Sequence, residues 1–206
     1  MMKQSFYILT LFAAILSLTS CSESEEAGEY DNWPERNQLY VDSIANLANS
    51  GADGWTKVVA FNLSEERENA YPNSNHFVYI KRIESGSGKR CPQYNDSIRV
   101  HYMGRLIPTD KYPQGYVFGK SYSTYVLNEA TDVPALMAMN QNVDGFATAL
   151  MRMVEGDVCK IVIPYYLGYG EKENSTGNIP GFSTLIFDVK LARVYRYGID
   201  YNTTWH

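Results

Sequence analysis

The stretch that decides the fold runs from residue 143 to residue 170 and reads VDGFATALMRMVEGDVCKIVIPYYLGYG. Its first part predicts a short helix, because Phe146, Leu150 and Met153 recur at helical spacing and a glycine-containing turn follows. The residues VCKIVIP then predict a strand that ends at Pro164. After the strand comes an uncharged loop rich in tyrosine and glycine. Since exposed loops often carry function, this aromatic loop is a candidate site.

Most of the chain around this helix predicts short strands. The segment SIRVHYMGRL at residues 97–106 alternates between two faces, and TLIFDVKLARVY at residues 184–195 predicts a long final strand. A further strand is expected in HFVYIKRIES at residues 76–85, whereas residues 107–135 are mostly loop. Five to six strands and one short helix indicate the α+β class, with an antiparallel sheet covered on one face.

Residues 31–75 predict an N-terminal helical appendage. Asp31-Asn32 can cap a helix that has Pro34 in its first turn, and Gly51 can close it. One face of this helix carries the large side chains of Trp33, Tyr40, Ile44 and Leu47. We expect the aromatic residues of the appendage to pack on the main domain rather than to bind a ligand.

The first residues of the chain predict a secretion signal. The apolar run FYILTLFAAILSL is too short to span a bilayer comfortably. The letters LTSC follow and end at Cys21, which resembles the signal of bacterial lipoproteins, where the cysteine is lipidated and becomes the new N-terminus. The alternative is an ordinary signal peptide with a chance cysteine. We expect a signal peptide at 1–20, lipidation of Cys21 and an acidic tether at 21–30. The protein would then be lipid-anchored in the cell envelope, on the periplasmic side or at the outer-membrane surface.

The charge and the histidines exclude several classes of function. The formal net charge is −5 for all 206 residues, and it becomes −6 once Lys3 leaves with the signal. A nucleic-acid partner is therefore not expected, because such proteins carry a basic stripe. The histidines His76, His101 and His206 are scattered without a paired-ligand pattern, so no metal site is predicted.

The two remaining cysteines, Cys91 and Cys159, leave two alternatives. A disulfide can form between them in an oxidising compartment. However, Cys159 alternates with Ile161 and Ile163 on the apolar face of a predicted strand. A buried free thiol is therefore the expected state of Cys159.

Four segments in the same order as in one known family carry a resemblance. They read VHYMGRL, VFGKSY, NVDGFATALMRMVEGDVCKIVIPYYLGYG and GNIPGFSTLIFDVKLARV. Together they resemble the FKBP-type peptidyl-prolyl cis-trans isomerases, collinearly from about Val78 to Val194. The resemblance implies a bent antiparallel half-barrel wrapped around one short helix. It places the isomerase domain at 76–196 and leaves a C-terminal tail at 197–206.

The resemblance also implies an activity that needs no cofactor. The family rotates Xaa-Pro peptide bonds, and an apolar site favours the twisted amide, which has lost its ground-state charge separation. No nucleophile, metal or strong base is required. Proline-containing polypeptides of exported proteins would be the clients, a macrolide is the inhibitor that the family implies, and the lipid anchor would connect the protein to a membrane.

The resemblance assigns the site residue by residue. Tyr169 would donate its hydroxyl to a substrate carbonyl, and the backbone N–H of Val143 would donate to another. An aromatic and aliphatic cup for the proline ring would consist of Tyr102, Phe118, Val143, Phe146, Ile179 and Phe187, with Met137 on its rim. Tyr165 and Tyr166 are expected outside the cup. Several cup residues, such as Tyr102 and Phe187, would look the same as plain core residues, so that alternative stays open.

Departures from the family pattern keep a second hypothesis open. The family pair Phe-Asp is Phe118-Gly119 here, which removes a carboxylate from the pocket, and Phe146 stands where the family has Trp. Ala135 and Met137 stand in a segment where the family commonly has aromatic residues. The first hypothesis is a prolyl isomerase. The second is a catalytically weak binding or chaperone-like module on the same half-barrel.

Overall fold

The computed structural model describes residues 28–63, 71 and 73–200. The expected signal peptide and lipidation site at Cys21 lie outside the described residues, as do most of the tether and the last part of the expected tail. The contacts divide the chain after Asp31. The unit from Asn32 onward contains the helices and strands of the described residues.

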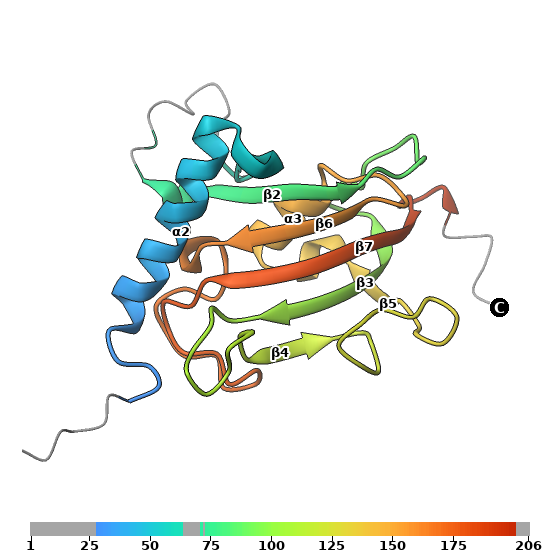
Figure 1. Ribbon diagram of the computed structural model, residues 1–206. Helices are drawn as coiled ribbons and strands as arrows, with labels where there is room; N and C mark the ends of the chain where they lie inside the picture. The colour runs from blue at the N-terminus through green and yellow to red at the C-terminus, as the bar shows by residue number, and fades with distance from the viewer. Residues whose placement is uncertain (1–27, 64–70, 72, 201–206) are drawn as a thin grey trace, which may run out of the picture. The chain divides into compact units, whose positions relative to one another are not determined.

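In the described residues, the fold is one antiparallel sheet with seven strands, drawn in Figure 1. The strands are β1 (Trp55–Val59), β2 (Phe77–Glu84), β3 (Ser97–Arg105), β4 (Val117–Lys120), β5 (Ala135–Ala138), β6 (Val158–Ile163) and β7 (Leu185–Tyr195). Their order is β1-β2-β6-β7-β3-β4, and β5 also pairs with β3. The antiparallel α+β prediction is confirmed, although the number of strands is higher than the five to six expected. Three of the seven were not named from the sequence: β1, which belongs to the segment expected to be a helical appendage, β4, which lies in the segment expected to be mostly loop, and β5, which begins at its end.

Strands β4 and β5 share one edge of β3 at opposite ends. β4 pairs with Met103 to Arg105, whereas β5 pairs with Ser97 to Val100. The other edge of β3 is paired with β7 along its whole length. Tyr102 therefore lies on β3 between the segment paired with β5 and the segment paired with β4.

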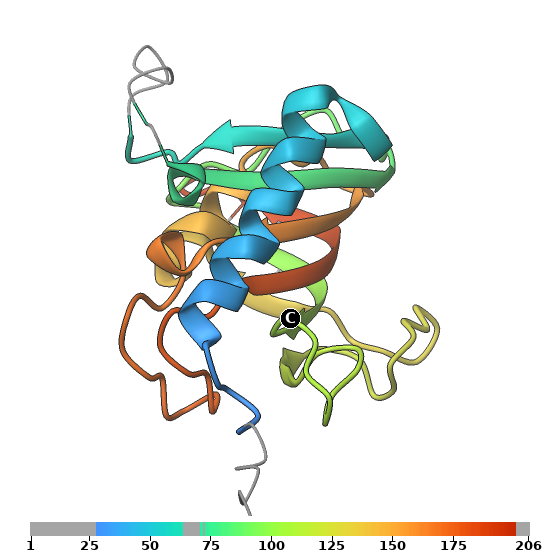
Figure 2. The same ribbon diagram turned by 60° about the vertical axis from the view of Figure 1, so that its left-hand side comes forward.

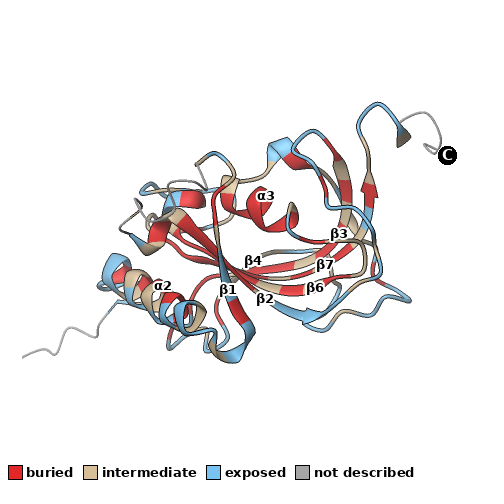
Figure 3. Ribbon diagram, turned by 90° about the horizontal axis from the view of Figure 1, so that it is seen from above, coloured by how far each residue is buried: buried red, intermediate tan, exposed pale blue. Residues whose placement is uncertain are grey.

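Helix α3 (Asp144–Leu150) lies inside the curve of the sheet, as Figure 3 shows. Every residue from Gly145 to Leu150 is buried, and the expected apolar stripe of Phe146, Leu150 and Met153 is at most 3% exposed. Gly145 permits close packing, since a Cβ there would lie 2.2 Å from Cγ2 of Ile163 on β6. The helix is thus fixed against the strand that follows it in the sequence.

Helix α2 (Trp33–Ser50) lies outside the curved sheet and packs against β1 and β2 (Figures 2 and 3). Trp33 is 3% exposed and donates from Nε1 to Ser183 Oγ at 2.9 Å, and Asn37 accepts from the N–H of Thr184 at 2.7 Å. Gly51 ends the helix in the left-handed region as expected, whereas the side chain of Asn32 makes no capping hydrogen bond. The helix therefore contacts the segment that leads into β7.

Short 3₁₀ turns complete the secondary structure of the described residues, at Ala52–Gly54, Ser74–His76, Met139–Gln141 and Tyr165–Leu167. Cys91 is exposed and Cys159 is buried, and neither forms a disulfide. The prediction of a buried free thiol at Cys159 is confirmed. Burial raises the pKa of this thiol above its usual value.

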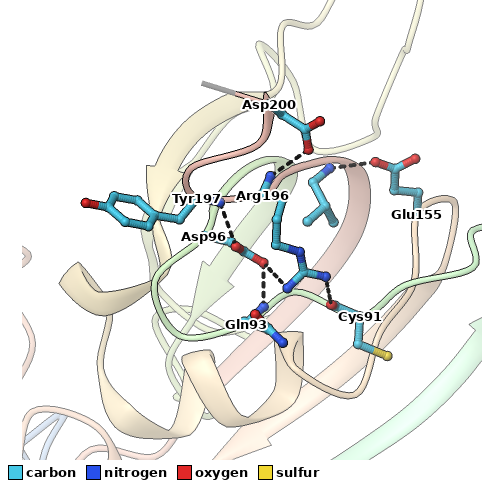
Figure 4. A network of polar contacts seen from close by, with 8 residues as sticks. Cys91, Gln93, Asp96, Glu155, Arg196, Tyr197 and Asp200 are labelled. Atoms are coloured by element: carbon cyan, nitrogen blue, oxygen red, sulfur yellow. Dashed lines mark hydrogen bonds and ion pairs between the residues drawn. The ribbon is translucent and has the colours of Figure 1, made fainter. Parts of the chain in front are cut away.

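A polar network fixes the chain after β7 to the loop before β3 (Figure 4). Asp96 is 1% exposed, pairs with Arg196 at 2.9 Å and accepts from the N–H groups of Gln93 and Tyr197. Arg196 also donates to the carbonyl of Cys91 at 3.3 Å. Because the buried carboxylate is fully partnered, it anchors one end of the strand pair that carries the cavity described next.

Candidate active site

A cavity of about 360 Å³ opens between β3, β4, β5, the start of α3 and the loops that follow β6. Its wall includes every cup and donor residue expected from the sequence: Tyr102, Phe118, Met137, Val143, Phe146, Tyr169, Ile179 and Phe187. It also includes Gly119, Gln141, Asn142, Asn174, Thr176 and Gly177. The structure thus brings all the expected residues to one place, while their roles in binding and catalysis stay predictions.

Aromatic rings pack against one another around Phe187 on β7. Its ring centroid lies 4.6 Å from that of Phe146 and 5.5 Å from that of Phe118, which stands at 87° to it. The ring of Tyr102 is 6.5 Å away. Such tilted and edge-to-face pairs are the favoured arrangements of aromatic side chains. Phe187 is therefore the common contact of the aromatic side of the cavity.

Gly104 makes this arrangement of rings sterically possible. In the register of β3 and β7, Gly104 is the partner of Phe187. A Cβ at Gly104 would lie 2.6 Å from the ring of Phe118 and 2.7 Å from that of Phe187. The sequence analysis did not single out Gly104, although it stands within the quoted segment VHYMGRL. A glycine inside an otherwise strong strand pattern signals a close approach of this kind.

The tyrosines of the loop after β6 point to three different places. Tyr165 packs on Phe182 with ring centroids 5.1 Å apart, and Tyr166 packs on His76 at 5.3 Å. Only Tyr169 lines the cavity, and 43% of it is exposed. A hydrogen bond of 2.9 Å from the N–H of Gly170 to the carbonyl of Tyr165 closes the loop, and Gly170 has a φ of 79°. The expected separation of Tyr169 from its two neighbours is found.

Ile179 is positioned by a small polar turn that the sequence analysis missed. Asn174 and Ile179 exchange backbone hydrogen bonds of 2.8 and 3.0 Å. The side chain of Asn174 accepts from the N–H of Thr176 at 3.1 Å, which is a typical Asx turn. Ile179 is 2% exposed as a result. The signal was the sequence NSTG, in which an asparagine precedes small turn residues.

None of the described residues in the wall of the cavity carries a carboxylate, amine, guanidinium or imidazole group. Burial raises the pKa of Tyr102 above its usual value, and the nearby Tyr169 contributes in the same direction. Tyr102 therefore remains a neutral phenol at physiological pH. Among the described residues, no group of three or more potential metal ligands comes together.

Comparison with known proteins identifies the family. The model of the FKBP-type peptidyl-prolyl cis-trans isomerases matches residues 88–192, about half of the chain, and the chain belongs to this family. It is 38% identical over 117 residues to the macrophage infectivity potentiator of Trypanosoma cruzi, covering 57% of this chain and 53% of that protein. It is 34% identical over 117 residues to the FKBP-type 22 kDa peptidyl-prolyl cis-trans isomerase of Escherichia coli K12, covering 57% of this chain and 50% of that protein. The chain thus spans about half the length of these curated relatives.

A solved structure shares the fold. It is a peptidyl-prolyl cis-trans isomerase from Pseudomonas syringae, with a TM-score of 0.52 and 20% sequence identity. The match covers 78% of this chain and 94% of that one. At this identity the likeness supports the architecture alone, and the function must be argued from the cavity.

Proposed function

We propose that this protein catalyses the cis–trans isomerisation of Xaa-Pro peptide bonds. The observation that carries the proposal is the cavity itself, which is aromatic and aliphatic on one side and has only neutral polar groups on the other. Its volume of about 360 Å³ falls within the range of roughly 300–1,000 Å³ that is usual for ligand sites. The apolar surface of a prolyl ring matches the aromatic and aliphatic side of such a site.

The chemistry follows from the polarity of the cavity. Rotation of an amide has a barrier of roughly 18–20 kcal/mol, because resonance is lost when the bond twists. The planar amide carries separated partial charges that water stabilises, and the twisted amide carries less. A cavity that removes water around the amide therefore raises the free energy of the planar amide more than that of the twisted amide, which lowers the barrier. The rings around Phe187 would provide this environment.

Neutral donors would orient the substrate without making the site polar. The hydroxyl of Tyr169 reaches the cavity from the loop after β6, and Val143 reaches it from the residue before α3. None of the hydrogen bonds found among the described residues uses the N–H of Val143 or the hydroxyl of Tyr169. Both groups are thus available to backbone carbonyls of a bound chain.

A catalytically weak binding module is the second candidate. The observation that favours it is Gly119, which lines the cavity where the family pattern has an aspartate. Isomerase activity and binding are separated by measuring both the isomerisation rate and the affinity of peptides that contain a single Xaa-Pro bond. Acceleration of the cis–trans interconversion above the uncatalysed rate supports the enzyme. Saturable peptide binding without acceleration would replace it with the binding module.

The proposal includes a place in the cell. The acidic segment and Cys21 support a lipid-anchored protein of the cell envelope that acts on proline-containing segments of exported proteins. In the part of the chain that the structure describes, no helix has the length and apolar character needed to cross a membrane. A macrolide should inhibit the enzyme by occupying the same cavity, and competition between a macrolide and an Xaa-Pro peptide tests this.

A further inference from the structure

The hydroxyl of Tyr102 has no partner in the described part of the chain, although the residue is firmly held. The N–H of Tyr102 donates to Ser121 Oγ at 2.9 Å, and its carbonyl accepts from the N–H of Ser121 at 2.9 Å. Its ring packs on Phe187. The backbone and ring are thus fixed, whereas the phenol oxygen, on the cavity side, makes no hydrogen bond with the described residues.

Gly119 leaves the space beside this hydroxyl open. A Cβ at Gly119 would lie 3.5 Å from the ring of Tyr102 and 3.6 Å from its oxygen. A side chain with an acceptor oxygen at this position, such as Asn or Asp, would therefore begin within reach of the hydroxyl and could accept its hydrogen bond. With glycine, the hydroxyl keeps its donor capacity and faces a cavity whose described lining residues are all uncharged.

We propose that the hydroxyl of Tyr102 donates directly to a backbone carbonyl of the bound polypeptide. This inference rests on the proposed function of the cavity and extends it. The substrate would be held between two phenol donors, Tyr102 on β3 and Tyr169 on the loop after β6, with the prolyl ring on Phe187. The glycine at 119 is then the residue that makes Tyr102 a substrate-contacting group rather than an internally bonded one.

The first test is Tyr102→Phe, which removes the hydroxyl and keeps the ring. Because the hydroxyl has no partner in the described chain, thermal stability should be unchanged. The kcat/KM for an Xaa-Pro peptide should fall about three- to tenfold, the loss expected for one neutral hydrogen bond. Tyr165→Phe is the matched control, since its ring packs on Phe182 outside the cavity. A fully active Tyr102→Phe variant of an active wild type overturns the proposal.

Two variants at Gly119 distinguish a Tyr102 hydroxyl that contacts the substrate from one that has only a structural role. Gly119→Asn adds an acceptor next to the hydroxyl, so the further loss caused by Tyr102→Phe should largely disappear in that background. Gly119→Ala adds a methyl group without an acceptor, so the loss should persist there. Equal losses in both backgrounds would contradict a free, substrate-directed hydroxyl.

A binding measurement distinguishes failure of the proposed isomerase activity from failure of the proposed role of Tyr102. If the wild type does not accelerate isomerisation, the affinity of the same Xaa-Pro peptide is measured by NMR titration. Tyr102→Phe should then weaken binding by a similar three- to tenfold factor. Equal affinities of wild type and variant would overturn the role of Tyr102 whatever the fate of the enzyme proposal.

Discussion

Gly104→Ala is the substitution for which the structure makes the sharpest prediction. The new methyl carbon would lie 2.6 Å from the ring of Phe118 and 2.7 Å from that of Phe187. Ordinary contact between carbon atoms begins at roughly 3.5 Å, so these rings must move by about 1 Å. Both rings line the cavity, and the movement therefore changes the shape of the site itself.

Two magnitudes follow from this displacement. Forcing an extra methyl group into a packed core costs about 1–3 kcal/mol of folding free energy. A misplacement of about 1 Å at a site can reduce catalysis by up to roughly 100-fold. We expect the variant to fold, to lose 1–3 kcal/mol of stability in a denaturant titration and to lose at least about tenfold in kcat/KM on an Xaa-Pro peptide.

The neighbouring strand offers a matched control for stability. Gly119 on β4 is the cross-strand partner of Gly104 on β3, but a Cβ there would make only ordinary contacts of 3.5 and 3.6 Å with Tyr102. Gly119→Ala should therefore keep or slightly raise the free energy of unfolding, because alanine reduces the entropy of the unfolded chain. If Gly104→Ala is as stable and as active as the wild type, the steric argument for the ring cluster is wrong.

Three further perturbations test other parts of the molecule. Tyr169→Phe should lower kcat/KM about three- to tenfold at unchanged thermal stability, while Tyr166→Phe should not; full activity of the first would remove Tyr169 as a donor. Burial lowers the pKa of His101, whose Nδ1 is buried without a partner among the described residues. In the unfolded chain His101 has its usual pKa of 6.5, so the unfolded state binds more protons than the folded state once the pH falls through 6.5. The free energy of unfolding should therefore decrease as the pH drops through that value, and His101→Gln should flatten this pH dependence in denaturant titrations. Cys21→Ser should release the protein from the membrane fraction, and persistent membrane association would contradict the lipid anchor.

The elements with a clear period were predictable from the sequence. The stripe of Phe146, Leu150 and Met153 marked the helix inside the sheet, and the alternation at residues 97–106 marked β3. Both patterns reflect which side chains are buried, and the spacing of apolar residues along the sequence predicts this burial. Strand β1 was missed because WTKVV is short and buried only at its two ends. Its place was decided by pairing with β2, which no local period reveals.

The cavity was predictable to a different extent. Its aromatic residues were predicted from four segments that resemble the FKBP family in the same order, because each segment aligns particular positions of this chain with the family's site. The Asx turn at Asn174 and the close approach at Gly104 were missed, since each depends on a contact between residues that the sequence does not place side by side. The steric exclusion of a Cβ at Gly104 can be recognised only when the positions of the neighbouring rings are known from the structure.

The glycine pair on β3 and β4 shows how a site without ionisable groups can still be specified by the sequence. Gly104 and Gly119 face each other in the register of the two strands, and both lie next to the aromatic side of the cavity. At Gly104 a side chain is excluded because the rings of Phe118 and Phe187 occupy its space. At Gly119 a side chain fits, but one with a hydrogen-bond acceptor would engage the hydroxyl of Tyr102. In the proposed site, Gly104 would shape the cup for the prolyl ring and Gly119 would leave the hydroxyl of Tyr102 free at its edge, so that the side chains the site lacks would define it as much as those that line it.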